Sequence, residues 1–294
     1  MKRLIVLLAF CSLSFSALAQ PKTVFTEGLR FCEGSVPYKH MVLVSNFGGD
    51  ALNPLNRAGK GYIAAINGDE VKTLIPSGKD YLNAPKGMAV LENHLFVADV
   101  GCVAVFNLKK PNDRPRYIKL SDDDLFANDV VVLGTLVLVS VTNTGKIYAI
   151  DATDINHLGA ASEVGSVEGA NGMAVWGTKI YIASYNPNEK PTSANVIYVY
   201  DITDPTPKLH PLIKDLPGGQ YDGIALSEDG SRIYFSSWTG KNGGAIYSYA
   251  LNGTEQVRTL DFGPQLTGPA DISIVGNMIY IPDLPESKVY RFQL

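Results

Sequence analysis

Short apolar segments separated by polar turns recur along the chain with the period of strands. In one example, the run from Tyr221 to Leu226 leads through a polar turn into the run from Ile233 to Trp238. Such runs are rich in Val, Ile, Tyr and Phe and are bounded by Gly, Asn and Asp, which is typical of strands joined by hairpins. No segment of any length has the spacing of an amphipathic helix. The pattern predicts an all-β protein.

One short motif, a polar or small start followed by an apolar strand, occurs six times. Its copies begin near residues 30, 84, 127, 170, 221 and 269. When the copies are aligned, they define one position, which we call the column: Glu33, Lys86, Asn128, Asn171, Asp222 and Ala270. Successive column residues are 42 to 53 positions apart, which suits four short antiparallel strands and their turns. The sequence therefore predicts one domain over residues 20–294, a six-bladed β-propeller.

The sixth copy has room for only three strands before the sequence ends at Leu294. The segment 22–26 precedes the first copy and has strand character. We expect this N-terminal strand to complete the last blade and close the ring, because closure removes a sheet edge that would otherwise be exposed.

Residues 1–19 have the features of a secretory signal peptide. Two basic residues, Lys2 and Arg3, precede a mainly apolar run, and a small-residue cleavage site ends at Ala19. We expect cleavage near Ala19 and a protein that is secreted or periplasmic. Later apolar runs are shorter than the ~18 residues of a membrane span, so none is expected.

Charge and motifs exclude several functional classes. The formal net charge of −4 becomes −6 once the two basic residues of the leader are removed, and no basic cluster occurs. Nucleic-acid binding therefore lacks its usual signal. Motifs for a nucleophilic serine, a Walker loop and a zinc protease are also missing. The expected partner is a small molecule.

Two cysteines remain after the leader, Cys32 and Cys102, in a compartment that is expected to be oxidising. The repeat places Cys102 in a loop of blade two that faces the side on which Cys32 enters blade one. The sequence leaves two interpretations open: one disulfide between them, or two separate buried thiols.

The column carries the candidate chemistry. In a propeller the first strand of each blade lines the central channel, so Glu33, Asn128, Asn171 and Asp222 are expected to converge. Two carboxylates and two amides suit a hard divalent cation, best Ca²⁺, although Mg²⁺, Mn²⁺ and Zn²⁺ are not distinguished. The alternative is ordinary turn chemistry, because Asn-Gly and Asp-Gly favour chain reversals without any metal.

Lys86 is the exception in the column, since an ammonium group repels a cation. The sequence leaves open whether Lys86 pairs with Glu33, meets an anionic substrate or points away.

At these residues the chain resembles the SMP-30/gluconolactonase family of six-bladed propellers, over its whole length after the leader. Four motifs carry the resemblance, each beginning at a proposed ligand: Glu33-Gly34-Ser35-Val36, Asn128-Asp129, Asn171-Gly172 and Asp222-Gly223. The resemblance implies that these four residues hold one divalent ion at the channel mouth and that the protein hydrolyses a sugar lactone or another lactone.

We therefore expect a metal-dependent hydrolase that acts on a lactone or similar cyclic ester. Asp222 is the candidate base for a water molecule, and Asn128 can orient the substrate as well as bind the ion. Lys86, Phe126, Tyr221 and Trp238 are the candidate substrate contacts. The alternative is a non-catalytic secreted propeller that binds a sugar, peptide or protein partner and holds a structural ion.

Overall fold

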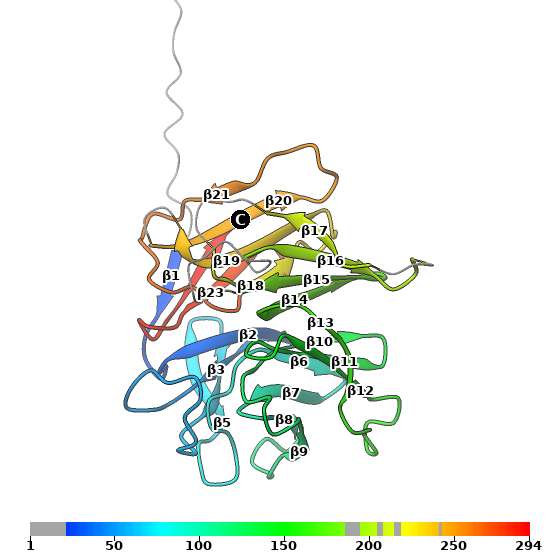
Figure 1. The fold of residues 1–294 in the computed structure, drawn as a ribbon. Helices are drawn as coiled ribbons and strands as arrows, with labels where there is room; N and C mark the ends of the chain where they lie inside the picture. The colour runs from blue at the N-terminus through cyan, green and yellow to red at the C-terminus, as the bar shows by residue number, and fades with distance from the viewer. Residues whose placement is uncertain (1–21, 186–194, 205–207, 215–218, 241–242) are drawn as a thin grey trace, which may run out of the picture.

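The computed structural model describes residues 22–185, 195–204, 208–214, 219–240 and 243–294. Within them the chain forms six four-stranded antiparallel sheets, which are arranged as blades around a central axis (Figure 1). The predicted all-β, six-bladed propeller is therefore confirmed. None of the described segments is a helix with the length and hydropathy needed to cross a membrane. The predicted signal peptide lies outside the described residues.

Blades one to five each contain four strands that follow one another in chain order. Blade one has β2 (Cys32–Tyr38), β3 (Met41–Asn46), β4 (Tyr62–Asn67) and β5 (Glu70–Ile75), and blade two has β6 (Met88–Leu91), β7 (His94–Asp99), β8 (Cys102–Asn107) and β9 (Arg116–Lys119). Blade three has β10 (Ala127–Leu133), β11 (Leu136–Val141), β12 (Lys146–Asp151) and β13 (Ser162–Ser166). Blade four has β14 (Ala170–Trp176), β15 (Lys179–Ser184), β16 (Ile197–Asp201) and β17 (His210–Ile213), and blade five has β18 (Tyr221–Leu226), β19 (Arg232–Gly240), β20 (Gly243–Ala250) and β21 (Arg258–Leu260).

Blade six joins strands from distant parts of the sequence. It consists of β22 (Ser273–Val275), β23 (Met278–Asp283), β24 (Lys288–Gln293) and β1 (Lys22–Phe25). β1 pairs antiparallel with β24, with Phe25 opposite Val289. The Phe25 side chain is buried in a cluster that includes Val42 and Ile66 of blade one. The first strand thus completes the last blade, as the sequence predicted, and also packs against the first.

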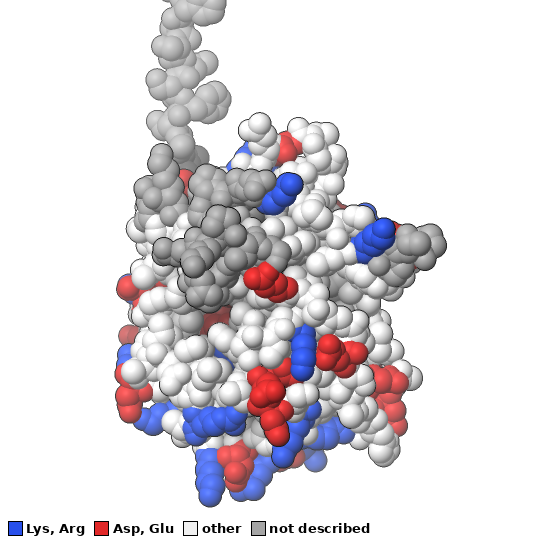
Figure 2. Space-filling view, viewed as in Figure 1, with Lys and Arg blue, Asp and Glu red and all other residues white. Residues whose placement is uncertain are grey.

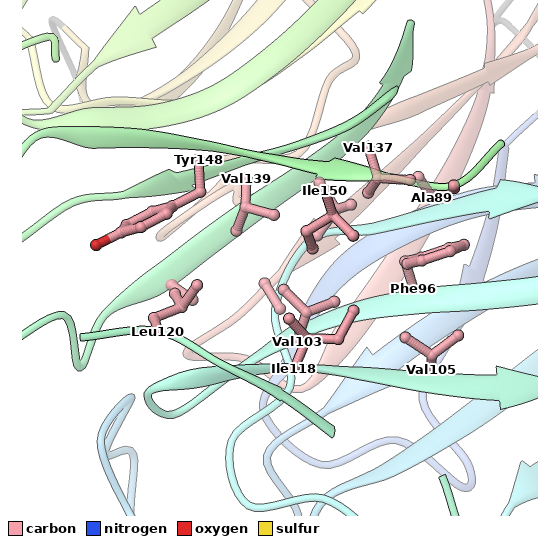
Figure 3. Packing of buried hydrophobic residues seen from close by; sticks show 14 of the residues in the cluster. Ala89, Phe96, Val103, Val105, Ile118, Leu120, Val137, Val139, Tyr148 and Ile150 are labelled. Atoms are coloured by element: carbon pink, nitrogen blue, oxygen red, sulfur yellow. The ribbon is translucent and has the colours of Figure 1, made fainter. Parts of the chain in front are cut away.

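Apolar side chains fill the spaces between neighbouring blades. Figure 3 shows the space between blades two and three, where Phe96 and Val103 lie near Val139 and Ile150. All four are fully buried. Burying a side chain of this kind contributes roughly 1.5–3 kcal/mol. The strands of each blade are rich in Val, Ile and Phe because they bury side chains against the next blade.

Charged side chains of both signs are interspersed on the face seen in Figure 2, with Lys and Arg most frequent at the lower edge. Two ion pairs from blades one and two illustrate the mixture: Lys72 with Glu70, and Arg114 with Asp80. These pairs are exposed, and exposed pairs contribute about 0–1 kcal/mol each. This face therefore has no uniform charge.

Candidate functional site

The four predicted ion ligands occupy equivalent places in the structure. Each is the second residue of the innermost strand of its blade: Glu33 in β2, Asn128 in β10, Asn171 in β14 and Asp222 in β18. These strands face the middle of the ring (Figure 1). The four side chains are buried, with 2–5% of their surface exposed. The Asn171 side chain is hydrogen-bonded to Asp222, and the charge of Asp222 acts on Glu33, so the ring brings these three residues together.

A β-bulge accompanies each of the four. In blades one, three, four and five the pairing of the first two strands shifts around the column residue, between Cys32 and Ser35 in blade one and between Tyr221 and Ile224 in blade five. No such shift occurs between the first two strands of blades two and six, whose column residues are Lys86 and Ala270. Because a bulge changes the direction of a side chain, it explains how four oxygen-bearing side chains are placed together.

The innermost strands approach one another closely at the residue that follows the column. A Cβ atom added at Gly223 would lie 2.4 Å from the Cα atom of Asp271 in the next blade. Ser236 Oγ accepts a hydrogen bond from Gly223 N and donates one to Ala270 O, both at 2.8 Å. Glycine is required here for close approach, and the serine ties blade five to blade six.

Each of the four residues leaves one buried oxygen without a hydrogen-bond partner in the described part of the chain. These atoms are Glu33 Oε2, Asn128 Oδ1, Asn171 Oδ1 and Asp222 Oδ1. An unsatisfied buried polar group costs about 1–3 kcal/mol. Four acceptors of this kind in one ring form an oxygen-rich site, which fits the ligand preference of a hard cation.

Asp222 is held by two neighbours. Trp238 Nε1 donates a hydrogen bond to Asp222 Oδ2 at 2.7 Å, and Asn171 contributes a second one. Burial raises the pKa of Asp222 to about 7, although both hydrogen bonds act in the opposite direction. Trp238 was predicted as an apolar wall, but its indole N–H also determines which oxygen of Asp222 stays free.

Lys86 is fully buried and has no carboxylate within salt-bridge distance in the described residues. Its Nζ donates to Ala84 O at 2.9 Å and lies 4.9 Å from the ring centre of Phe126 and 5.5 Å from that of Phe47. Burial lowers the pKa of Lys86 to about 8, while the charges of Asp99 and Glu33 act to raise it. The side chain therefore keeps its proton at neutral pH without a direct ion pair to Glu33.

The pKa of the Glu33 carboxyl group is also shifted by burial and by neighbouring charges. Burial and the charge of Asp222 raise the pKa of Glu33 well above its usual range, and the charge of Lys86 only partly offsets them. Glu33 and Asp222 are thus both difficult to ionise in this buried ring, mainly because burial removes the water that would stabilise their charged forms.

Apolar side chains cover one side of the mouth. A buried cluster combines Phe31, Phe47, Ala84, Val100, Ala270 and Leu284, and Trp238 packs against it. The ring of Phe126 lies close to Lys86 on the same side. The ring of Tyr221, another predicted substrate contact, is buried between blades four and five and packs against Phe235 with ring centres 5.3 Å apart. Its role stays a prediction.

A second ring lies one residue further along the innermost strands. It consists of Gly34, Gly87, Asp129, Gly172, Gly223 and Asp271. Asp129 and Asp271 come from opposite blades and are hydrogen-bonded to each other through their side chains. Burial raises the pKa of Asp129 to about 7, and burial together with the charge of Asp129 raises the pKa of Asp271. Two buried carboxyl groups in contact favour a state in which they share one proton.

Sequence reasoning did not assign a role to this acidic pair. The signal was present, because the position after the column is glycine in four copies and aspartate in the other two. Asp129 also accepts backbone hydrogen bonds from Val130 and Met173, both at 2.6 Å. It therefore ties blade three to blade four.

The predicted disulfide between Cys32 and Cys102 is not formed, and both residues are free thiols. The Cys32 side chain is fully buried, and its Sγ donates to Lys288 O at 3.1 Å. Burial raises the pKa of both thiols, that of Cys102 to about 12. The interpretation as two separate thiols applies.

Within the described ranges, no group of three or more His, Cys, Asp and Glu side chains is arranged to hold a metal ion. The column differs from such a group, because two of its four oxygen-bearing members are amides. Any ion bound here would depend on Asn128 and Asn171 as much as on the carboxylates.

No protein-family model and no curated protein sequence matches the chain. Solved structures do share its fold. A luciferin-regenerating enzyme is 14% identical with a TM-score of 0.63, and the alignment covers 93% of this chain and 96% of that one. A catalytically inactive virginiamycin B lyase from Staphylococcus aureus, solved with quinupristin, is 12% identical with a TM-score of 0.59 and coverages of 93% and 99%.

The same fold also occurs in a nidogen/laminin complex, at 12% identity and a TM-score of 0.59, covering 78% of this chain and 83% of that chain. At these identities the similarity defines the fold alone. The chain is thus a six-bladed β-propeller of an architecture that enzymes and binding proteins share.

Proposed function

We propose that this protein is a secreted, metal-dependent hydrolase of the SMP-30/gluconolactonase type that opens a lactone or a similar cyclic ester. One divalent cation, preferably Ca²⁺, would be held by Glu33, Asn128, Asn171 and Asp222. The observation that carries the proposal is the set of four buried oxygens that lack hydrogen-bond partners in the described structure. Mg²⁺, Mn²⁺ and Zn²⁺ are the other candidates for the same oxygens.

A bound divalent cation supplies Lewis acidity, which polarises an ester carbonyl and lowers the pKa of a water molecule. The chain supplies the remaining functions. Asp222 is the candidate base through Oδ1, its oxygen without a hydrogen-bond partner in the described residues, while Trp238 and Asn171 hold the carboxylate in place. A carboxylate oxygen has two lone pairs, so the same Oδ1 can face both the cation and the water molecule. Asn128 is placed to orient the substrate, and Phe126 and Trp238 to exclude water.

The second candidate function is non-catalytic binding of a sugar, peptide or protein, with the cation as a structural element. The fold is compatible with it, because propellers serve both enzymes and binding proteins. The occurrence of the fold in a nidogen/laminin complex is in keeping with this alternative.

The test compares the wild-type protein with Asp222→Ala by elemental analysis, and measures hydrolysis of a panel of aldonolactones with added Ca²⁺. The proposal predicts one ion per chain in the wild type, none in the variant, and loss of turnover in a folded variant. Asp122→Ala is the matched control, because Asp122 is exposed on the loop before blade three.

An ion without turnover would favour the binding protein. If the wild-type protein took up no ion, the column would be turn chemistry and the proposal would fail.

A further inference from the structure

The Lys86 ammonium group is buried, and it has more hydrogen-bond donors than the described structure has acceptors for it. The group has three N–H donors, and the described structure gives it one acceptor, Ala84 O. The charge of Asp99 acts to raise the pKa of Lys86. However, the Asp99 carboxylate already accepts hydrogen bonds from the backbone N–H groups of Asn83 and Ala84. A buried charge without a partner costs several kcal/mol. Fixing the fold does not require such a residue, because Ala270 occupies the equivalent position in blade six.

The position of Lys86 in the ring places its charge beside the proposed ion site. Blade two lies between blades one and three, so Lys86 is flanked by the blades that carry Glu33 and Asn128. With the divalent cation of the proposed function bound, the column residues and the ion have a formal charge of +1. Asp129 already accepts the backbone N–H groups of Val130 and Met173 and shares a hydrogen bond with Asp271. Neither this acidic pair nor Asp99 is within salt-bridge distance of Lys86 in the described residues, so neither accepts a hydrogen bond from the ammonium group.

A neutral lactone would bring no charged acceptor to the two remaining N–H donors of Lys86. The aromatic faces of Phe47 and Phe126 attract the ammonium group, but they cannot accept its hydrogen bonds. A carboxylate can accept them and carries the opposite charge. A phosphate dianion usually engages several cationic donors, whereas the column contains one.

We propose that Lys86 is a specificity-determining residue that binds a carboxylate, so that the site prefers a lactone carrying a carboxylate group to a neutral lactone. This inference rests on the proposed function for its ion and its reaction, and it adds the charge of the substrate. The bond that breaks is the ring ester, and the carboxylate bound by Lys86 is a separate group that stays unchanged.

The first experiment uses two lactones that differ only at one carbon, D-glucono-1,4-lactone with a CH₂OH group and D-glucaro-1,4-lactone with a carboxylate. We expect kcat/KM of the Ca²⁺-loaded wild-type protein to be at least tenfold higher for the anionic lactone, mainly through KM. Lys86→Met, which has a similar length and no charge, should bring the ratio close to one. Lys60→Met is the control, since Lys60 is an exposed lysine in the loop after β3.

The second experiment does not depend on turnover. Calorimetry with D-gluconate as the probe should show binding to the Ca²⁺-loaded wild-type protein, about tenfold weaker binding to Lys86→Met, and unchanged binding to Lys60→Met. Ca²⁺ alone should bind Lys86→Met about tenfold more tightly, because a repelling charge is removed. Lys86→Arg keeps the charge and should retain D-gluconate binding.

The two proposals fail in different ways. If neither lactone is hydrolysed but D-gluconate binding depends on Ca²⁺ and on Lys86, the hydrolase proposal fails and the role of Lys86 stands. If the neutral lactone is used as well as the anionic one by the wild-type protein, the role of Lys86 is overturned. This comparison holds even if Lys86→Met does not fold.

Discussion

Trp238 donates its indole N–H to Asp222 Oδ2 at 2.7 Å, while Asp222 Oδ1 has no hydrogen-bond partner in the described residues. The two residues lie on neighbouring strands of blade five, β19 and β18. Together with Asn171, this donor fixes the carboxylate and leaves its other oxygen without a hydrogen bond.

Trp238→Phe should weaken the proposed ion site without removing a ligand. Loss of the N–H removes one of the two hydrogen bonds to Asp222, which should cost about 1–3 kcal/mol in the free energy of unfolding, and it leaves the carboxylate held by Asn171 alone. We expect roughly tenfold weaker Ca²⁺ binding by calorimetry, which corresponds to about 1.4 kcal/mol. Trp176→Phe, at a tryptophan that is 44% exposed, is the control and should bind Ca²⁺ normally.

Removal of the ion should lower the melting temperature. A ligand that binds only the folded state contributes about 2.7 kcal/mol at a concentration one hundred times its Kd. Chelation with EGTA should therefore shift thermal unfolding of the wild-type protein downward, and added Ca²⁺ should restore it. Asp222→Ala should show no such shift. Equal melting temperatures of the wild-type protein with and without Ca²⁺ would contradict the ion site.

The ion-free protein should lose stability as the pH rises. Burial raises the pKa of Asp222 and of Asp129 to about 7, so both hold a proton in the folded state at a pH where the unfolded chain has lost it. Stability then falls between about pH 4 and pH 7, by about 1.4 kcal/mol for each pH unit and group. Urea unfolding in EGTA at pH 5 and pH 8 measures this change, and saturating Ca²⁺ should reduce it. A stability that increases over this interval without Ca²⁺ would argue against the raised pKa values.

Asp271→Asn should flatten that pH dependence. The substitution removes one of two carboxyl groups in contact and leaves a side chain that can still hydrogen-bond to Asp129. We expect a small gain in stability, about 1 kcal/mol, at pH 8 in EGTA, on the scale of one pKa unit. The measurement is urea unfolding at pH 5 and pH 8. A loss of stability at pH 8 equal to the loss at pH 5 would mean that the pair carries no unfavourable charge.

Phe25→Ala tests the closure of the ring. The side chain is 4% exposed and joins blade six to blade one, so its removal should cost about 3–5 kcal/mol. Val24→Ala, at the neighbouring residue that is 38% exposed, should cost less than about 1 kcal/mol. Chemical unfolding of both variants gives the comparison. Equal losses would mean that β1 adds no packing between the blades.

The repeat made the architecture predictable, because every copy has to bury the same face against its neighbour. Alignment of the copies by sequence was enough to assign Glu33, Asn128, Asn171 and Asp222 to one ring. The bulges around them could not be predicted, since they depend on the pairing of the second strand and on the approach of the neighbouring blade.

Directions of side chains were the weaker part of the prediction. Tyr221 lies next to Asp222 in sequence, and its ring is buried against Phe235. The same limit applies to the cysteines: their loops face the same side, but Cys32 Sγ is directed toward Lys288 O. Position in a repeat determines where a backbone lies and leaves the orientation of individual side chains to local packing.

Pairing of β1 with β24 also determines when the molecule can be completed. Lys22 is opposite Phe292, so this contact joins residues separated by almost the whole described chain. Contacts of such separation form late because a very large loop must be closed first. Blades one to five can assemble as each is synthesised, but the sixth has to wait for β24. Until then β1 has no partner strand and the ring stays open.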